Sequence, residues 1–370
     1  MNTQISKNNK NKSMTNRKYS LTVGVALFFS CTIIYAGNPE RAGQAGATQL
    51  LINPYARTSG WAGANQANVR GIEAQFWNVA GTVFTKKTEF YFSRTEWLVG
   101  TGININTLGF TQRVGEVSAL GLGIVNINGG NLVRTTEDQP EGGMGTFSPN
   151  FLNLSLSYAR MFSDDIYGGI NLKVVNERIP GVQATGIAID GGIQYHTGKY
   201  KQAHFGVSIK NWGPKMQYRG DALTFQSLTN PYPQYQRTVQ NRSAFFEMPL
   251  AMNIGVAYDF NLTNDSIIDG IRKHRLSVAA NYLSNSFTYD NYLFGLEYAW
   301  KERVMLRAGF QAEKYIFDST KRMTALTGPT AGLTIEWPMN EKRSTIAFDY
   351  SYRFTNPFGG VHTFGFRVNL

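Results

Sequence analysis

Apolar residues alternate with polar or small residues over long stretches of this chain, and no other feature constrains its fold as strongly. In residues 361–370, Phe364, Phe366 and Val368 occupy every second position, and the same period of two runs through residues 344–354. Successive side chains of a β-strand point to opposite faces, so each stretch predicts a strand with one apolar face. Because a water-soluble sheet also alternates in this way, strand length, loop length and export signals must show whether that face meets lipid.

Fourteen stretches of the chain have this strand character. Most of them approach the roughly 9 to 11 residues that a tilted strand needs to cross a bilayer, which exceeds the ~5 to 6 residues typical of soluble sheets. The predicted strands are residues 88–94, 101–111, 117–128, 151–162, 166–176, 184–196, 202–212, 249–260, 274–286, 290–300, 303–312, 327–337, 343–354 and 361–370. We therefore predict an all-β fold, a transmembrane antiparallel β-barrel of about fourteen strands.

The connections between these strands alternate in length, as the short periplasmic turns and long external loops of outer-membrane barrels do. The short turns are residues 163–165, 197–199, 301–302 and 339–340, and the long connections are residues 129–150, 177–183, 213–248, 313–326 and 355–360. Two connections depart from this rule. Residues 261–273 form a long periplasmic connection, and the external turn near residues 287–289 is brief. The strand count could therefore differ by two.

The first 36 residues have the features of a secretory signal peptide. Basic residues such as Lys7 and Arg17 precede an apolar run, no acidic residue is present, and Ala36 offers a cleavage point. A lipoprotein is the alternative, because Cys31 also follows apolar residues, but the apolar run continues beyond this cysteine. Cleavage after Ala36 leaves a mature chain without cysteine, and therefore without disulfides, thiolate metal ligands or a cysteine nucleophile.

Charge and hydropathy restrict the partners of the mature chain. The whole sequence carries a formal charge of +11, and removal of the five basic residues of the signal peptide lowers it to +6. This surplus is too small and too dispersed to indicate nucleic acid as a partner. After the signal peptide, no apolar run approaches the ~20 residues of a spanning helix. A chain of this kind in a membrane must cross it as a closed barrel.

No catalytic or metal-binding constellation stands out in the sequence. His196, His204, His274 and His362 lie on separate predicted strands or at their ends, without the close spacing of a metal site. A histidine could meet a serine across neighbouring strands, as in membrane phospholipases, yet no local motif indicates such a pair. We predict that the protein is not an enzyme and uses neither a metal nor another cofactor.

Residues 37–87 precede the first predicted strand and differ from the wall in composition. They are rich in small residues and have no period of two. This segment also contains large apolar residues that would contact water if it were unfolded, namely Leu50, Leu51, Ile52, Trp61, Ile72, Phe76 and Trp77. We predict a compact hatch of short helices in the lumen, with an unstructured periplasmic tail as the alternative. The expected domains are a signal peptide (1–36), the hatch (37–87) and the barrel (88–370).

Several motifs resemble the PorV/PorQ family of Bacteroidetes outer-membrane proteins, which is itself similar to the fatty-acid-transporter type of fourteen-stranded barrel. They are Ala56-Arg57 with Gly60-Trp61-Ala62-Gly63, Gly71-Ile72-Glu73-Ala74 with Trp77-Asn78-Val79-Ala80-Gly81, Thr88-Glu89 with Trp97, and Phe147-Ser148-Pro149-Asn150-Phe151. The resemblance continues through residues 158–179 and 192–195, and it covers about half of the mature chain. The other half matches only in barrel pattern. In one departure, Val79 stands where the family usually has proline.

The resemblance implies an accessory role in type IX protein secretion at the cell outer membrane. PorV-like members lie beside the translocon, receive cargo by its C-terminal signal domain and pass it to the surface attachment machinery. The implied partners are the type IX translocon, its cargo proteins and outer-membrane lipid. The residues alone are also consistent with two other functions: a transporter of small hydrophobic molecules across the outer membrane, and an uncharacterised structural role.

External loop 213–248 is the best candidate for partner binding. Aromatic residues and arginines, which are enriched at protein interfaces, occur together in it. The candidate residues are Tyr218, Arg219, Phe225, Tyr232, Tyr235, Arg237, Phe245 and Phe246. The alternative is that these side chains pack the loop over the barrel mouth.

Charged residues of both signs fall on the face predicted to line the lumen. They are Lys173, Asp190, Asp259, Glu297, Glu336, Asp349, Arg353 and Arg367. Mixed signs favour pairing with the hatch, since the constriction of an ion-selective pore usually carries one sign. The alternative is a solvated interior wall.

Overall fold

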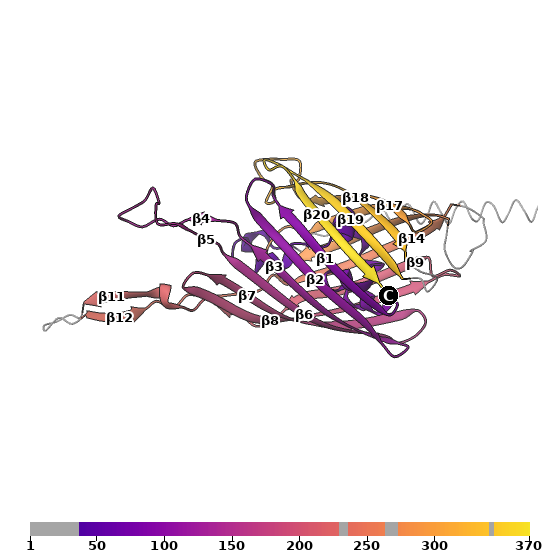
Figure 1. The fold of residues 1–370 in the computed structure, drawn as a ribbon, viewed down its shortest axis with the longest axis horizontal. Helices are drawn as coiled ribbons and strands as arrows, with labels where there is room; N and C mark the ends of the chain where they lie inside the picture. Colours follow the sequence, from indigo (N-terminus) through magenta and orange to yellow (C-terminus); the bar gives the residue numbers. More distant parts are fainter. Residues whose placement is uncertain (1–36, 229–235, 263–272, 340–343) are drawn as a thin grey trace, which may run out of the picture. The chain divides into compact units, whose positions relative to one another are not determined.

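Fourteen strands of the computed structural model, which describes residues 37–228, 236–262, 273–339 and 344–370, close into one antiparallel barrel (Figure 1). They are β1 (Thr88–Trp97), β2 (Ile103–Val114), β3 (Ser118–Asn128), β6 (Asn150–Met161), β7 (Ile166–Ile179), β8 (Val182–Thr197), β9 (Ala203–Trp212), β14 (Ala251–Asn261), β15 (His274–Asn285), β16 (Asn291–Trp300), β17 (Val304–Glu313), β18 (Leu326–Pro338), β19 (Thr345–Thr355) and β20 (Val361–Asn369). Pairing of β1 with β20 closes the wall. The predicted fold class and number of strands are confirmed.

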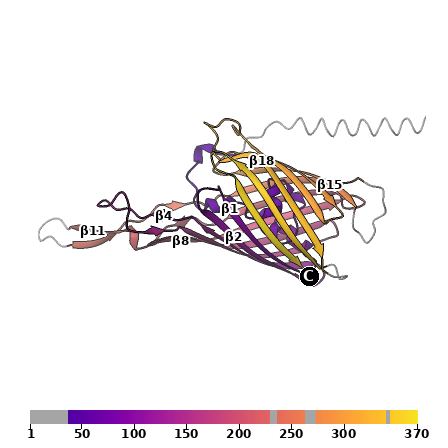
Figure 2. The same ribbon diagram turned by 45° about the horizontal axis from the view of Figure 1, so that its top comes forward.

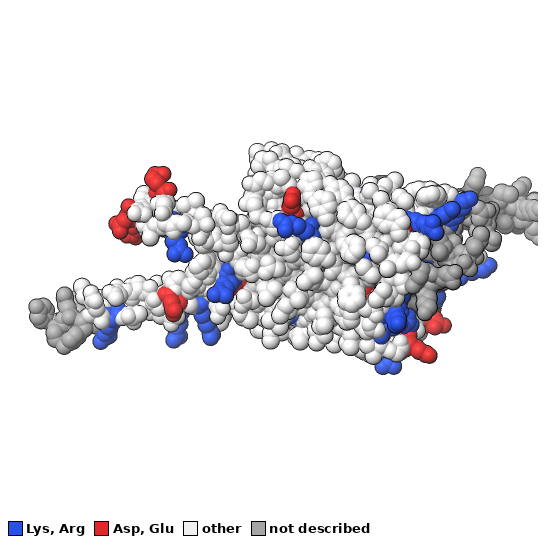
Figure 3. Space-filling view, in the orientation of Figure 1, with Lys and Arg blue, Asp and Glu red and all other residues white. Residues whose placement is uncertain are grey.

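The alternation of the sequence becomes an apolar outer face and a polar inner face. Leu154 and Ile254 face outward with 40% and 45% of their surface exposed, whereas the inward-facing Ser157 and Asn253 are fully buried. On the face shown in Figure 3, charged side chains gather towards the ends of the wall. An apolar belt of this kind lowers the free energy of a barrel in lipid and would be unfavourable in water. The chain is therefore an outer-membrane protein.

Residues 37–87 fill the lumen with short helices and turns (Figure 2). The helices are η1 (Pro39–Arg41), η2 (Thr48–Leu51), α2 (Ala56–Gly60), η3 (Ala64–Ala67), η4 (Gly71–Glu73), α3 (Ala74–Trp77) and η5 (Val79–Phe84). Trp61 and Ile72 are fully buried, so the segment is packed and is not a free tail. Gly63 adopts a φ of +78°, and a Cβ there would lie 2.1 Å from Trp77, so glycine is required at this close contact.

Val79, which replaces the proline usual in the resembled family, begins η5 without disturbing it. Asn78 precedes this helix in an extended conformation, and its Oδ1 accepts a hydrogen bond from Ala80 N at 3.2 Å. Proline suits the first position of a helix because its fixed φ is helical and its missing N–H is not needed there. Asparagine capping achieves the same start with valine. None of the helices in the described ranges is long and apolar enough to cross a bilayer.

The long external loops carry β-structure of their own, at the end of the barrel where β14 begins. β4 (Leu132–Val133) pairs with β5 (Thr146–Phe147). Residues 213–248, predicted as a loop, contain β10 (Met216–Gln217), η6 (Asp221–Leu223), β11 (Thr224–Leu228), β12 (Gln236–Gln240) and β13 (Phe245–Phe246). The β4–β5 and β11–β12 pairs both extend away from the wall (Figure 1).

The predicted signal peptide, most of connection 261–273 and part of turn 339–340 lie outside the described residues. The predicted external turn between β15 and β16 is brief, as expected. It lies at the external end, because Asn285 pairs with Ala251, the first residue of β14 after loop 213–248. Opposite to it, the periplasmic end contains the last residues of β20.

Candidate functional site

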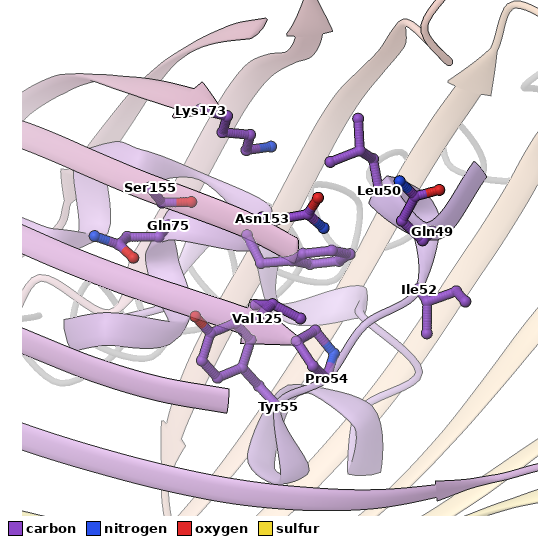
Figure 4. Close-up of a pocket in the computed structure, with 11 residues that line it drawn as sticks. Gln49, Leu50, Ile52, Pro54, Tyr55, Gln75, Val125, Asn153, Ser155 and Lys173 are labelled. Atoms are coloured by element: carbon purple, nitrogen blue, oxygen red, sulfur yellow. The ribbon is translucent and has the colours of Figure 1, made fainter. Parts of the chain in front are cut away.

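A small cavity lies between the hatch and the wall, towards the external end of the lumen (Figure 4). Its volume is about 30 Å³, which holds about two water molecules. The apolar lining residues are Leu50, Ile52, Pro54, Tyr55, Phe76 and Val125, and the polar ones are Gln49, Gln75, Asn153, Ser155 and Lys173. An apolar lining with a few polar groups is typical of sites for small molecules.

Two polar atoms at the cavity are buried without a hydrogen bond from any described residue. Gln75 Nε2 donates to Ser157 Oγ at 2.7 Å, which fixes the amide, but Gln75 Oε1 accepts no hydrogen bond. The Oδ1 atom of Asn153 is buried in the same way. Buried acceptors of this kind are stabilised by any donor that reaches them, so they are points where a guest could be oriented.

A β-bulge in β9 brings Asn211 to the ion pair that Lys173 and Asp190 form at the cavity. The register of β8 and β9 shifts between Ile189 and Gly191, where Asn211 has a φ of +62°. Lys173 Nζ lies 2.6 Å from Asp190 Oδ2 and donates to Asn211 Oδ1 at 2.9 Å, while Asn211 N donates to Asp190 Oδ1 at 2.7 Å. This closed set of bonds compensates the burial of both charges.

Lys210, the residue before Asn211, faces the lumen next to the hatch at a regular inward position of β9, in line with His204 and Ser208. Its Nζ lies 3.7 Å from the ring centroid of Phe76 and 4.9 Å from that of Trp77. A cation over aromatic faces is favourable, and more so where water is excluded. Lys210 therefore connects the wall to α3, whose residues line the cavity.

Further hydrogen bonds hold the hatch on the β8 and β9 side of the wall. Asn78 Nδ2 donates to Ile193 O at 3.0 Å, and Ser208 Oγ donates to Trp77 O at 2.8 Å. Gln194 Nε2 donates to Gln66 O at 3.1 Å. Inside the hatch, Arg57 Nε lies 3.3 Å from Glu73 Oε2; burial raises the pKa of Glu73, and Arg57 opposes that shift. The hatch is thus held by polar contacts as well as by packing.

The charges predicted for the lumen do face it. The prediction that they pair with the hatch is largely wrong. Most of them pair with charges on other strands of the wall: Glu297 lies 2.7 Å from Arg275 and 2.5 Å from Arg307. Arg367 lies 3.2 Å from Glu336. One of the charges predicted for the lumen, Arg353, does contact the hatch, because its guanidinium donates a hydrogen bond to Asn53 O at 3.0 Å. Neighbouring inward positions of adjacent strands are close enough for such pairs, which isolated strand patterns do not reveal.

Two histidines that the sequence placed on separate strands are neighbours in the barrel. His196 pairs in register with His204, and their ring centroids are 4.3 Å apart. The His204 Nε2 atom lies 3.3 Å from Asp259 Oδ2. The two histidines lie at equal distances on either side of the β8–β9 turn. This equal spacing is the sequence signal from which their contact could have been predicted. No group of three or more potential metal ligands occurs within the described ranges.

The loop residues proposed for partner binding separate into two groups. Tyr218 and Phe246 lie with ring centroids 5.2 Å apart against a buried cluster that includes Met216 and Met248, so they pack the loop onto the mouth. The exposed group, which is available to a partner, consists of Arg219, Phe225, Arg237 and Phe245. Tyr232 and Tyr235 lie outside the described residues.

Solved outer-membrane structures share this architecture at low sequence identity. The Pseudomonas putida toluene transporter TodX aligns with a TM-score of 0.53 and 11% identity, covering 86% of this chain and 97% of TodX. A TodX deltaS2S3 mutant, described as a monoaromatic hydrocarbon channel, gives a TM-score of 0.51 and 12% identity over 81% of this chain and 95% of that one.

No protein-family profile matches the sequence. No curated protein matches it either. At 11% identity the likeness to TodX concerns the fold. It confirms, at the level of fold, the similarity to barrels of the fatty-acid-transporter type. The chain is an outer-membrane β-barrel that shares its fold with TodX.

Proposed function

We propose that this protein transports small hydrophobic molecules across the outer membrane. The observation that carries the proposal is a barrel of the TodX fold whose hatch and wall enclose a partly apolar cavity. TodX is described as a toluene transporter, and its alignment spans nearly its whole length. Transfer of an apolar molecule out of water into such a lining is favoured by the hydrophobic effect.

The cavity defines a closed state of this transporter. A ring the size of benzene occupies a cavity of about 150 Å³, whereas this one has about 30 Å³. The hatch must therefore move to admit a guest. Its helices have three to six residues, and such short helices have little stability apart from their packing. Rearrangement of η2 or α3 thus costs less than breaking the hydrogen bonds between wall strands.

Substitution of Ser155 tests whether the cavity lies on the transport route. Ser155 belongs to the wall, so its replacement leaves the hatch sequence intact. A phenyl group in Ser155→Phe exceeds the cavity, and we expect it to remove most uptake of toluene or a similar apolar compound into cells. Ser155→Ala keeps the volume and should retain uptake. Leu154→Phe, on the lipid face, controls for the added ring.

Unchanged uptake by Ser155→Phe, in a protein that still migrates as a folded barrel, would remove the cavity from the route. Equal losses in all three variants would indicate a folding defect, which heat-modifiable migration on gels separates from a transport defect.

The accessory role in type IX secretion is the second candidate, and the β11–β12 pair favours it. This two-stranded sheet extends away from the mouth, and Phe225 and Leu228 are 46% and 60% exposed. A two-stranded sheet alone is only marginally stable in water, and its free edges and exposed apolar groups suit a protein partner. The proposed partners are the translocon and cargo of that system.

Removal of the β11–β12 pair separates the two functions. Asn241 N donates to Leu223 O at 2.8 Å, so residues 224–240 can be replaced by a short glycine linker without displacing the strands of the wall. For the transporter, we expect normal uptake and normal secretion of proteins that carry the C-terminal export signal. Loss of secretion or surface attachment with normal uptake would instead support the secretion role.

A further inference from the structure

The nitrogen of Gly37 is held at the external mouth of the barrel. It donates to Asp290 Oδ2 at 2.7 Å, in the turn between β15 and β16. Asp290 is buried and also accepts from Tyr282 Oη at 2.9 Å and from Asn285 N at 3.3 Å. A Cβ on Gly37 would lie 2.7 Å from Thr288 O and 2.8 Å from Asp290 N, so the site fits glycine without displacement of the turn.

The residues after Gly37 are clamped to the same mouth. Arg41 Nη2 lies 2.8 Å from Glu247 Oε2, and its guanidinium lies 4.3 Å from the ring centroid of Phe287. Gly46 N donates to Glu247 O at 3.0 Å. The segment then enters η2, whose residues Gln49 and Leu50 line the cavity. A fixed Gly37 therefore fixes the outer end of the hatch beside the cavity.

We propose that the bond between Ala36 and Gly37 is hydrolysed during export and that the new terminal ammonium of Gly37 forms an ion pair with Asp290, which anchors the hatch. Hydrolysis consumes one water, leaves a carboxylate on Ala36 and converts the Gly37 amide into an ammonium. The nitrogen thereby changes from one N–H donor without charge to three donors with a positive charge.

This change strengthens the bond between Gly37 and the buried Asp290 carboxylate. A processed Gly37 places a cation at hydrogen-bonding distance from Asp290, and charge-assisted bonds are the stronger kind. The processing site predicted by the sequence is thus also the point where the mature amino terminus meets its partner in the fold.

The first measurement is the mass of the amino-terminal peptide of the protein purified from the outer membrane, where we expect an unmodified Gly37. The second is hydrogen exchange of peptides from the folded protein. In Asp290→Asn we expect exchange in residues 38–52 to be about tenfold faster, as for a lost bond to a charged group. Residues 74–84 should be unchanged. Asp138→Asn, an exposed external aspartate, is the matched control.

Gly37→Ala provides an independent variant, because it keeps Asp290 with its bonds to Tyr282 and Asn285. It should accelerate exchange in residues 38–52 as well, since the added Cβ displaces the nitrogen from the carboxylate. A mature protein that begins elsewhere, for example at an acylated Cys31, would overturn the proposal. Wild-type exchange in either folded variant would overturn it too.

Discussion

The direction of each side chain decides how well the wall tolerates a charge. Leu154 and Ile254 face lipid, whereas Ser155 faces the lumen beside Lys173. Arginine at Leu154 or Ile254 should destabilise the barrel by ~2 to 4 kcal/mol near the bilayer midplane, because lipid cannot solvate its charge. Arginine at Ser155 should cost less. Urea titration of the protein refolded in vesicles measures the differences, and equal costs at the three positions would contradict this assignment of faces.

Residues of the hatch make contacts with the wall that the alternation pattern of the strands cannot predict. Lys210 contacts Phe76 and Trp77 from a regular inward position of β9, and the bulge next to it turns Asn211 inward as well. In an unbroken strand, the alternation would place Asn211 outward, but both Lys210 and Asn211 are buried. Bulges often redirect side chains near functional sites, and this one lies beside the cavity.

Among the elements, the hatch depends on glycine at the contact between η3 and α3. Gly63→Ala places a methyl group 2.1 Å from Trp77 and retains a φ of +78°, so strain and overpacking together should cost ~2 to 5 kcal/mol of hatch stability. Gly100→Ala, at a φ of +105° with no atom within 4 Å, adds strain alone. Exchange of residues 56–84 should accelerate in Gly63→Ala and stay unchanged in Gly100→Ala. Equal protection in both variants would show that Trp77 can move aside.

At the scale of the whole molecule, the strands of the wall form a closed barrel that does not need the hatch for its backbone hydrogen bonds. Every barrel strand pairs with two neighbours, so its backbone groups are satisfied within the wall. Deletion of residues 37–84 should therefore leave a folded, heat-modifiable barrel and open its polar lumen to water. We expect ion conductance in planar bilayers from the deletion protein and little from the intact one. Failure of the deleted protein to fold would assign the hatch a role in the core of the barrel.

The strands could be predicted closely from the sequence where alternation is regular. Residues 274–286 were expected and His274–Asn285 are found; residues 88–94 were expected, but β1 continues to Trp97. The error at β1 arises because Arg94 and Glu96 stand on its outer face near the external end, where polar residues interrupt the apolar pattern. Alternation identifies the part of a strand in lipid better than the part beyond it.

By itself, the sequence determined the class of the fold, the strands and the face that meets lipid, because a period of two is a local property of the chain. Tertiary structure decided the rest. It placed Gly37 against Asp290, brought His196 to His204, paired Glu297 with two arginines and formed the cavity between hatch and wall. These contacts join residues that are distant in sequence or belong to different strands, and the register and closure of the barrel set their distances.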